Sequence, residues 1–202
     1  MSMNWIGAAD SKAVLAALAM LLTVVAFVPY LRSIFLGQTR PHVFSWIIWG
    51  INTGVAFLAV LAERGGAGAW PIGFSCVLTL FVAALAYLKR ADVTITRVDW
   101  LFFSAALIAM PAWWVANDPL WAVVLITGIE LLGFGPTFRK CWHQPYSESI
   151  SFLATLIVRN MLIVAALEHY QFTTLLFPIA MAAACGGLIA IMLWRRPRAA
   201  SA

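Results

Sequence analysis

Phe27-Val28-Pro29-Tyr30-Leu31-Arg32 is followed 107 residues later by a related stretch, Phe134-Gly135-Pro136-Thr137-Phe138-Arg139, and this repeat is the strongest indication of the architecture. The same offset, without a gap, superimposes Trp70-Pro71-Ile72 on Phe177-Pro178-Ile179. A register that holds from the first apolar segment of each copy to the third indicates a duplicated unit of three helices. Internal repeats of this kind are typical of membrane transporters.

The composition argues against a water-soluble domain. The chain has 202 residues, of which 63% are hydrophobic and only 10% are charged. A soluble chain of this length cannot bury so much apolar surface. Seven continuous apolar stretches approach the roughly 20 residues that cross the hydrocarbon core, and their continuity favours helices over barrel strands. They lie at residues 14–36, 42–62, 68–88, 98–115, 118–138, 149–167 and 172–194.

The repeat and the apolar stretches together predict the order of the parts. Residues 1–90 form a first three-helix repeat, residues 91–116 a linker helix, and residues 117–202 a second repeat with a short basic tail. Three spans leave the chain on the opposite side of the membrane, so one added helix lets the second copy start from the same side as the first. We therefore expect an all-α polytopic membrane protein with seven transmembrane helices as two parallel repeats, in a 3+1+3 order.

The distribution of Lys and Arg predicts the orientation. With the amino terminus outside, the outer side receives only Lys12 and Arg64. The inner side receives ten basic residues: Arg32, Arg40, Lys89, Arg90, Arg97, Arg139, Lys140, Arg195, Arg196 and Arg198. This bias predicts that the amino terminus lies outside and the carboxyl terminus in the cytoplasm. We expect an integral membrane protein of a bacterial inner membrane. The basic residues of the cytoplasmic side thus account for the net charge of +5, and nucleic acid is not expected as a partner.

Glu130 and Arg159 are the charged residues deepest in the predicted spans. Glu130 lies nine residues before Arg139, about 13 Å from the inner boundary, and Arg159 reaches the same depth on the next span. An isolated charge near the bilayer centre costs at least about 2.5–3.5 kcal/mol, so such residues pair, face water or serve a function. We expect the two to form an ion pair or to share a water-filled cavity. A purely structural pair is the alternative.

The repeat offset places neutral polar residues opposite these charges. Subtracting 107 maps Glu130 onto Thr23 and Arg159 onto Asn52. A pocket between the repeats would thus be polar on both walls, with Trp49 one turn from Asn52 as a surface on which a ring can stack. The expected solute-binding residues are Asn52, Trp49, Glu130, Arg159 and Asn160.

Enzymatic chemistry finds no support in the sequence. The three cysteines, Cys76, Cys141 and Cys185, form no CxxC pair, and no HExxH or GxSxG motif is present. The three histidines, His42, His143 and His169, fall in predicted loops. We expect no enzyme, no metal and no cofactor.

The segments after the two first-helix prolines carry a family resemblance. In the second copy, Pro136-Thr137-Phe138-Arg139-Lys140 leads to Tyr146-Ser147-Glu148-Ser149-Ile150-Ser151, and in the first Pro29-Tyr30-Leu31-Arg32 leads to Thr39-Arg40-Pro41-His42-Val43-Phe44-Ser45. With the 3+1+3 plan, these segments resemble the SWEET and PQ-loop transporter families. The resemblance implies alternating access, with bending at Pro29 and Pro136. The pair Pro71 and Pro178 repeats at the same spacing and is a second predicted hinge pair.

The sequence favours a transporter of a small polar solute, working as a facilitator or a proton-coupled carrier. The resemblance implies a sugar, but the third helices carry no Asn, which SWEET sugar carriers typically place there, so an amino acid or vitamin-like metabolite stays open. The alternative is a membrane receptor or accessory protein on the same scaffold, in which Arg159 binds a carboxylate-bearing ligand. The sequence also leaves open whether the chain forms a homo-oligomer.

Overall fold

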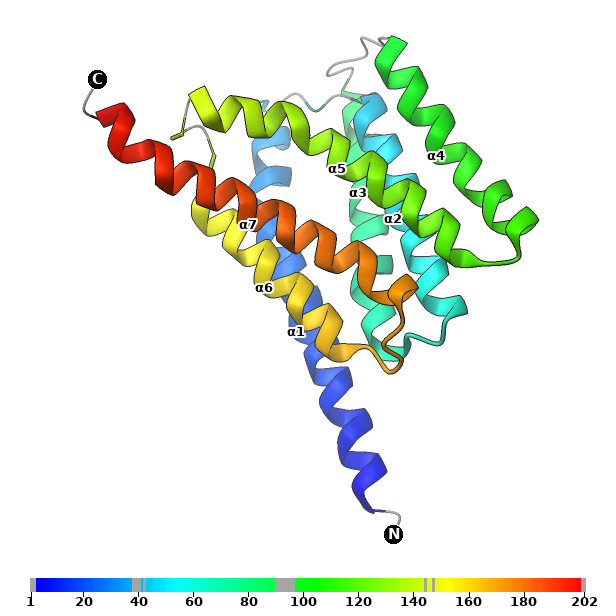
Figure 1. The fold of residues 1–202 in the computed structure, drawn as a ribbon. Coiled ribbons are helices and arrows are strands. Elements are labelled where there is room, and N and C mark those ends of the chain that lie inside the picture. The colour runs from blue at the N-terminus through cyan, green and yellow to red at the C-terminus, as the bar shows by residue number, and fades with distance from the viewer. Residues whose placement is uncertain are drawn as a thin grey trace.

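The described part of the chain is helical throughout. The computed structural model describes residues 3–37, 41, 43–89, 97–143, 145–146 and 148–200. Their elements, in chain order, are α1 (Met3–Phe35), α2 (Val43–Ala62), the 3₁₀ helix η1 (Gly66–Ala69), α3 (Trp70–Leu88), α4 (Arg97–Ala116), α5 (Pro119–His143), α6 (Ile150–Ala166) and α7 (Phe172–Ala200) (Figure 1). Each of the seven predicted apolar stretches falls on one of the α-helices. The part of the predicted linker helix before Arg97 lies outside the described residues.

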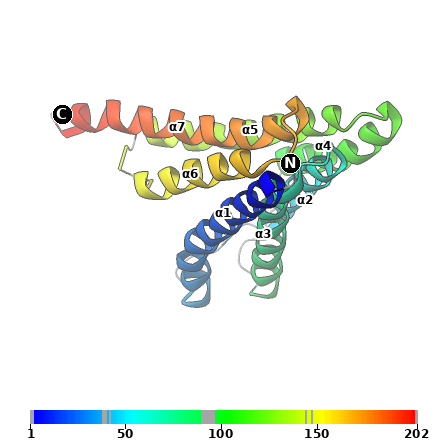
Figure 2. The same ribbon diagram turned by 90° about the horizontal axis from the view of Figure 1, so that it is seen from below.

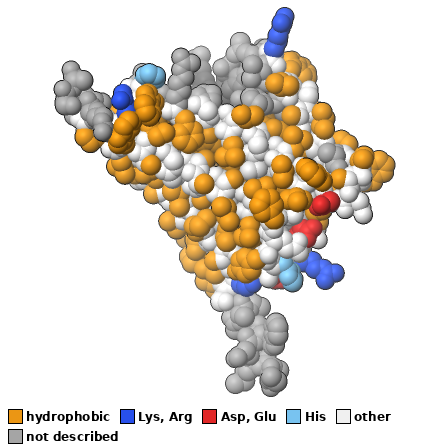
Figure 3. Space-filling model, in the orientation of Figure 1, with side chains coloured by type: hydrophobic (Ala, Val, Ile, Leu, Met, Phe, Trp, Pro, Cys, Tyr) orange, Lys and Arg blue, Asp and Glu red, His pale blue; other side chains and the backbone are white. Residues whose placement is uncertain are grey.

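Within the described residues, four helical stretches are long and apolar enough to cross a membrane: Asp10–Phe35, Val43–Ala62, Gly66–Leu88 and Phe172–Pro197. The apolar parts of the other helices, Phe103–Ala116, Pro119–Gly135 and Ile150–Ala166, are shorter. Large apolar side chains such as Leu21, Trp114 and Leu132 are exposed, and hydrophobic side chains cover most of the face seen in Figure 3. Apolar surface on this scale is rare on soluble monomers and is what a lipid environment requires. The architecture is that of an all-α membrane protein.

Local sequence explains where the later helices begin. The hydroxyl of Ser149 accepts a hydrogen bond from the backbone N–H of Phe152 at 3.3 Å and so caps α6. At the start of α5, Asp118 Oδ1 accepts a hydrogen bond from the N–H of Leu120 at 2.9 Å. Pro119 is the first residue of this helix, where a backbone N–H would have no partner in the helix, so its absence loses no hydrogen bond.

Two groups of three helices, α1 to α3 and α5 to α7, have internal contacts in the same order. In the first group α3 contacts both α1 and α2, and in the second α7 contacts both α5 and α6. The groups meet through α1 against α6 and α2 against α5, while α4 packs against α5 and α2. Figure 2 shows the second group as a layer that crosses the helices of the first at an angle.

The two ends of the helix assembly differ in charge. The described residues Arg32, Lys89, Arg97, Arg195 and Arg196 lie at helix ends on one side, which we call the basic end. The opposite side, the η1 end, carries η1, Arg64 and the α6–α7 connection. Arg40 and Arg90 lie outside the described residues, as do the side chains of Arg139, Lys140 and Arg198. Among the described residues, Lys and Arg are thus more frequent at the basic end than at the η1 end, as the sequence predicts.

The repeated prolines do not all occupy equivalent positions. Pro29 lies inside α1 and Pro178 inside α7, where each removes a helix hydrogen bond. Pro71 lies in the first turn of α3, where its missing N–H would have no helical partner anyway. Pro136 lies within α5, and its side chain is outside the described residues. Bending by loss of a hydrogen bond therefore applies to Pro29 and Pro178 but not to Pro71, and the hinge role stays a prediction.

Candidate solute-binding cavity

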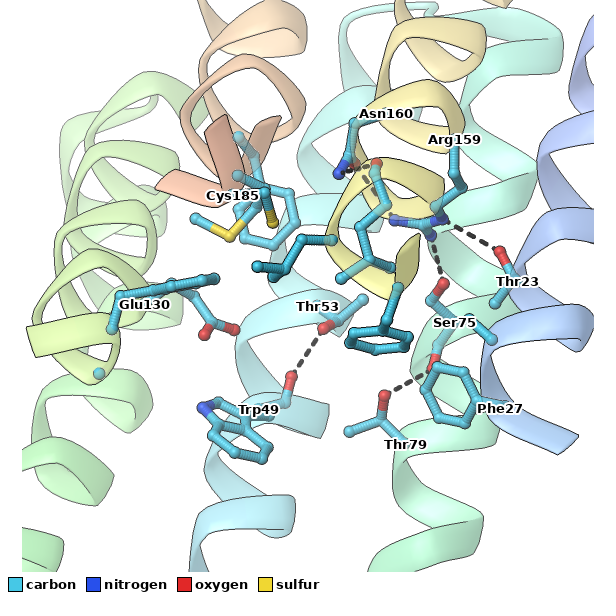
Figure 4. A pocket seen from close by; sticks show the side chains of 18 of the residues that line it. Thr23, Phe27, Trp49, Thr53, Ser75, Thr79, Glu130, Arg159, Asn160 and Cys185 are labelled. Carbon is cyan, nitrogen blue, oxygen red and sulfur yellow. Dashed lines mark hydrogen bonds between the residues drawn. The ribbon is translucent and has the colours of Figure 1, made fainter. Parts of the chain in front are cut away.

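A cavity of about 390 Å³ lies between the two groups of helices (Figure 4). Its walls come from α1, α2 and α3 on one side and from α5, α6 and α7 on the other. The polar and aromatic residues that line it include Thr23, Phe27, Trp49, Thr53, Ser75, Thr79, Glu130, Phe152, Arg159 and Asn160. Four of the five predicted solute-binding residues thus line one cavity, and the fifth, Asn52, lies buried behind its wall.

Arg159 joins α6 to both α1 and α3. Its Nε donates to Thr23 Oγ1 at 3.0 Å, and its Nη1 donates to Asn160 Oδ1 at 3.2 Å. Its Nη2 donates to the Pro71 carbonyl at 3.1 Å and to Ser75 Oγ. All four acceptors are neutral oxygens, so these bonds orient the guanidinium without neutralising its charge.

Glu130 enters the same cavity from α5. Figure 4 shows its carboxylate and the Arg159 guanidinium projecting into the pocket from opposite sides. Glu130 is only 9% exposed, and within the described residues it forms no salt bridge with Arg159 or with any other cation. Of the two predicted arrangements, the ion pair is therefore not formed, because the two groups lie on opposite walls. The shared cavity is the arrangement that the structure has.

Asn52 is the side chain that lies against the Glu130 carboxylate. Asn52 is completely buried, yet its amide does not complete a hydrogen bond: neither Nδ2 nor Oδ1 has a partner in the described part of the chain. The hydroxyl of Thr127, one turn before Glu130, is buried and unpartnered in the same sense. Buried polar atoms are nearly always hydrogen-bonded, so this cluster has capacity for a bound water or solute group.

The two polar contacts are related by the sequence offset of 107. Thr23 maps onto Glu130 and Asn52 maps onto Arg159, so the Thr23–Arg159 contact between α1 and α6 corresponds to the Glu130–Asn52 contact between α2 and α5. Each junction between the groups therefore carries one charged and one neutral polar residue. The charge is positive at one junction and negative at the other.

The remaining predicted residues have different surroundings. Asn160 is nearly buried, and its Nδ2 donates to the Leu156 carbonyl at 2.9 Å while its Oδ1 accepts from Arg159. Both polar atoms of the Asn160 side chain are thus engaged within the protein, and this side chain orients Arg159. Trp49 is 38% exposed, and its ring centroid lies 5.3 Å from that of Trp46.

A second cavity, of about 730 Å³, leads from the first toward the basic end. It is lined by Tyr30 and Trp46 and by Ser149 and Ser151 at the start of α6. The two cavities share wall residues of α1, α2, α6 and the connection before α6, namely Ala26, Phe27, Trp49, Glu148 and Phe152. The binding cavity is thus continuous with an aromatic-lined opening at the basic end.

The η1 end is closed by tight packing between the groups. Gly68 of η1 packs against the last turn of α6 so closely that a Cβ there would lie 2.8 Å from Leu167 N and 2.9 Å from Ile163 O. The Glu168 N–H donates to the Gly65 carbonyl at 3.0 Å. A buried apolar cluster drawn from both groups, including Ala69, Ile72, Ile163, Leu167 and Phe177, fills the space beneath.

Two of the partners of Arg159 were not among the predicted site residues. Thr23 was signalled by the repeat offset, since it is the counterpart of Glu130. Ser75 gave no comparable signal, because its counterpart in the second repeat is Ala182.

Loss of the Thr23 hydroxyl is expected to destabilise the protein. Thr23 Oγ1 donates to the Ala19 carbonyl at 2.8 Å and accepts from Arg159, so Thr23→Val removes a hydrogen bond to a half-buried charged group. The expected loss is about 1–3 kcal/mol in the free energy of unfolding. Thermal unfolding of the detergent-solubilised protein should show a lower Tm. Thr155→Val is the matched control, because the Thr155 hydroxyl is exposed and bonds its own helix at Ser151 O; an equal Tm change in both variants would contradict this account.

No protein-family model, curated protein or solved structure matches the chain. The fold and the site define a class of protein. It is a helical membrane protein with a cavity, lined by Glu130 and Arg159, between the helices α1 to α3 and the helices α5 to α7.

Proposed function

We propose that the chain is a membrane transporter that moves a small polar solute by alternating access between two three-helix units. In this proposal all seven α-helices cross the membrane in a 3+1+3 order, as in the SWEET and PQ-loop families that the sequence resembles. The observation that carries the proposal is the position of the cavity. It lies at the junction of the groups, continuous with the basic end and sealed at the η1 end.

A site at the junction of two packed groups suits transport, because relative movement of the groups can close one entrance and open the other. The contacts that close the η1 end include the Glu168 N–H to the Gly65 carbonyl, Lys12 Nζ to the Leu167 carbonyl at 2.5 Å, and the close approach of Gly68 to α6. Separation of η1 from α6 would open a path to the cavity there. The aromatic side chains of Trp46 and Trp49 would then close the basic end.

The proposed orientation places the basic end in the cytoplasm and the amino terminus outside, in a bacterial inner membrane. The described basic residues at that end support it, since cytoplasmic loops are enriched in Lys and Arg. The conformation described above would then be the inward-open one. Transport is proposed to occur by facilitated diffusion or by coupling to protons carried on Glu130.

Reconstitution tests the proposal. Purified protein in sealed liposomes should take up at least one solute from a panel of amino acids, sugars and vitamin-like metabolites, and unlabelled solute on the far side should accelerate exchange. Ligand binding without flux would instead support a receptor that recognises a carboxylate through Arg159. Absence of both binding and flux across the panel would contradict transport.

A further inference from the structure

We infer that the solute is a zwitterion with an apolar body, of the chemical class of the apolar amino acids. The inference rests on the proposed function and names the substrate of the same cavity. Its basis is the pair of opposite charges on opposite walls: Arg159 and Glu130 face one space, and within the described residues neither has a counter-ion. A solute with one carboxylate and one ammonium group compensates both charges at once.

The Arg159 wall is the carboxylate side. Of the five guanidinium N–H groups, four donate to neutral oxygens, which leaves one Nη1 hydrogen. Ser75 Oγ accepts from Arg159, so its own hydroxyl hydrogen can be donated into the cavity that Ser75 lines. A solute carboxylate can accept from both donors, and charged hydrogen bonds of this kind are the strong ones.

The Glu130 wall is the ammonium side. The Glu130 carboxylate supplies a negative charge to the cavity, and the Asn52 amide lies against it behind the wall, buried and with its Oδ1 unpartnered among the described residues. An ammonium group donates three hydrogen bonds and needs acceptors that carry or accompany a negative charge. The offset relation between the Thr23–Arg159 and Glu130–Asn52 contacts places these opposite poles at corresponding points of the two junctions.

The surface between the poles is mostly apolar, with the hydroxyl groups of Thr53 and Thr79 as its polar part. Phe27, Trp49, Phe152 and Phe177 line the cavity, and its 390 Å³ holds roughly a dozen water-sized atoms. A sugar would place several hydroxyl groups against these rings without partners, which a specific site avoids. An aliphatic or aromatic side chain would instead remove apolar surface from water.

Ligand-dependent thermal shifts of the purified full-length protein test the inference with four probes. L-leucine carries both charges, 4-methylpentanoate lacks the amine, 3-methylbutylamine lacks the carboxylate, and glucose is neutral. We expect a Kd for leucine at least about tenfold lower than for each of the other three, because each of those lacks at least one of the two charged groups. The thermal shift reports this Kd, since bound ligand stabilises the folded state by RT ln(1 + [L]/Kd).

Two substitutions assign the poles. Arg159→Gln should remove the preference for leucine over 3-methylbutylamine, and Glu130→Gln the preference for leucine over 4-methylpentanoate. The matched controls Arg64→Gln and Glu63→Gln change residues at the η1 end and should preserve both preferences. If a glutamine variant does not fold, Arg159→Met or Glu130→Leu, which also removes the charge, provides the same comparison, since each ratio is measured within one variant.

Equal affinity for leucine and 4-methylpentanoate would overturn the inference, as would tighter binding of glucose or no stabilisation by any probe. Uptake of labelled leucine into liposomes separates this inference from the proposed function. Leucine binding without flux would overturn transport and leave the zwitterion site standing, whereas flux of glucose alone would support transport and overturn the zwitterion.

Discussion

Replacement of Arg159 by glutamine is expected to lower the initial rate of solute uptake into liposomes by at least about a hundredfold, since each lost hydrogen bond of a charged group costs about 1.5–3 kcal/mol. Glutamine cannot reach Thr23, Pro71 and Ser75 together, as the planar guanidinium does. It also removes the positive charge from the cavity. The measurement is the uptake rate per folded molecule, with the solute identified in the reconstitution panel.

Controls separate the charge from the packing role of Arg159. Arg64→Gln changes an exposed arginine at the η1 end and should leave uptake unchanged. Arg159→Lys keeps the charge but loses the forked donor geometry, so an intermediate rate is expected. A purely structural Arg159 would lower the yield of folded protein and leave the uptake rate per folded molecule unchanged, which would contradict the binding role.

Gly68→Ala is expected to slow uptake about tenfold while solute still binds. The added methyl group overpacks the η1 end, and overpacking destabilises a conformation by about 1–3 kcal/mol. The added Cβ would lie 2.8 Å from Leu167 N and 2.9 Å from Ile163 O, and backbone atoms cannot yield as a side chain can. The conformation closed at the η1 end is thus selectively destabilised. Uptake kinetics and ligand thermal shifts on the same preparation measure the two effects separately.

Gly128→Ala provides the matched control for this substitution. Gly128 lies within α5, and a Cβ there would meet no atom within 4 Å. Its uptake rate should therefore equal that of the parent chain. Equal rates in Gly68→Ala and Gly128→Ala would show that the η1 seal has no role in transport, and a loss of binding in Gly68→Ala would mean that the site itself had been disturbed.

The helices were predictable because continuous apolar runs and local stop signals determine them. The stretch predicted at 149–167 corresponds to α6 at Ile150–Ala166, since Ser149 caps that helix. The predicted start of the third stretch, at residue 68, falls in η1, because the glycines at 65, 66 and 68 permit a tight turn and close approach before α3 begins. The repeat offset also anticipated that Thr23 and Asn52 belong with the two charges.

The details of the site depend on how the two groups cross, which hydrophobic periodicity does not specify. Equal depth of Glu130 and Arg159 suggested an ion pair, but depth says nothing about the direction in which each side chain leaves its helix. The structure turns Arg159 toward α1 and α3, and Glu130 toward α2. Ser75 escaped prediction for the same reason, because only the tertiary arrangement brings α3 within reach of the long Arg159 side chain.

The most direct test of alternating access is the accessibility of a single position in the cavity wall from both sides of the membrane. Thr53 lines the cavity, so Thr53→Cys can be labelled with a membrane-impermeant thiol reagent in sealed vesicles of known orientation, with the parent chain as background. We expect labelling from both sides, and faster labelling from the η1 side when Gly68→Ala is added. Labelling from one side only, in both Thr53→Cys and Thr53→Cys with Gly68→Ala, would contradict transport by alternating access.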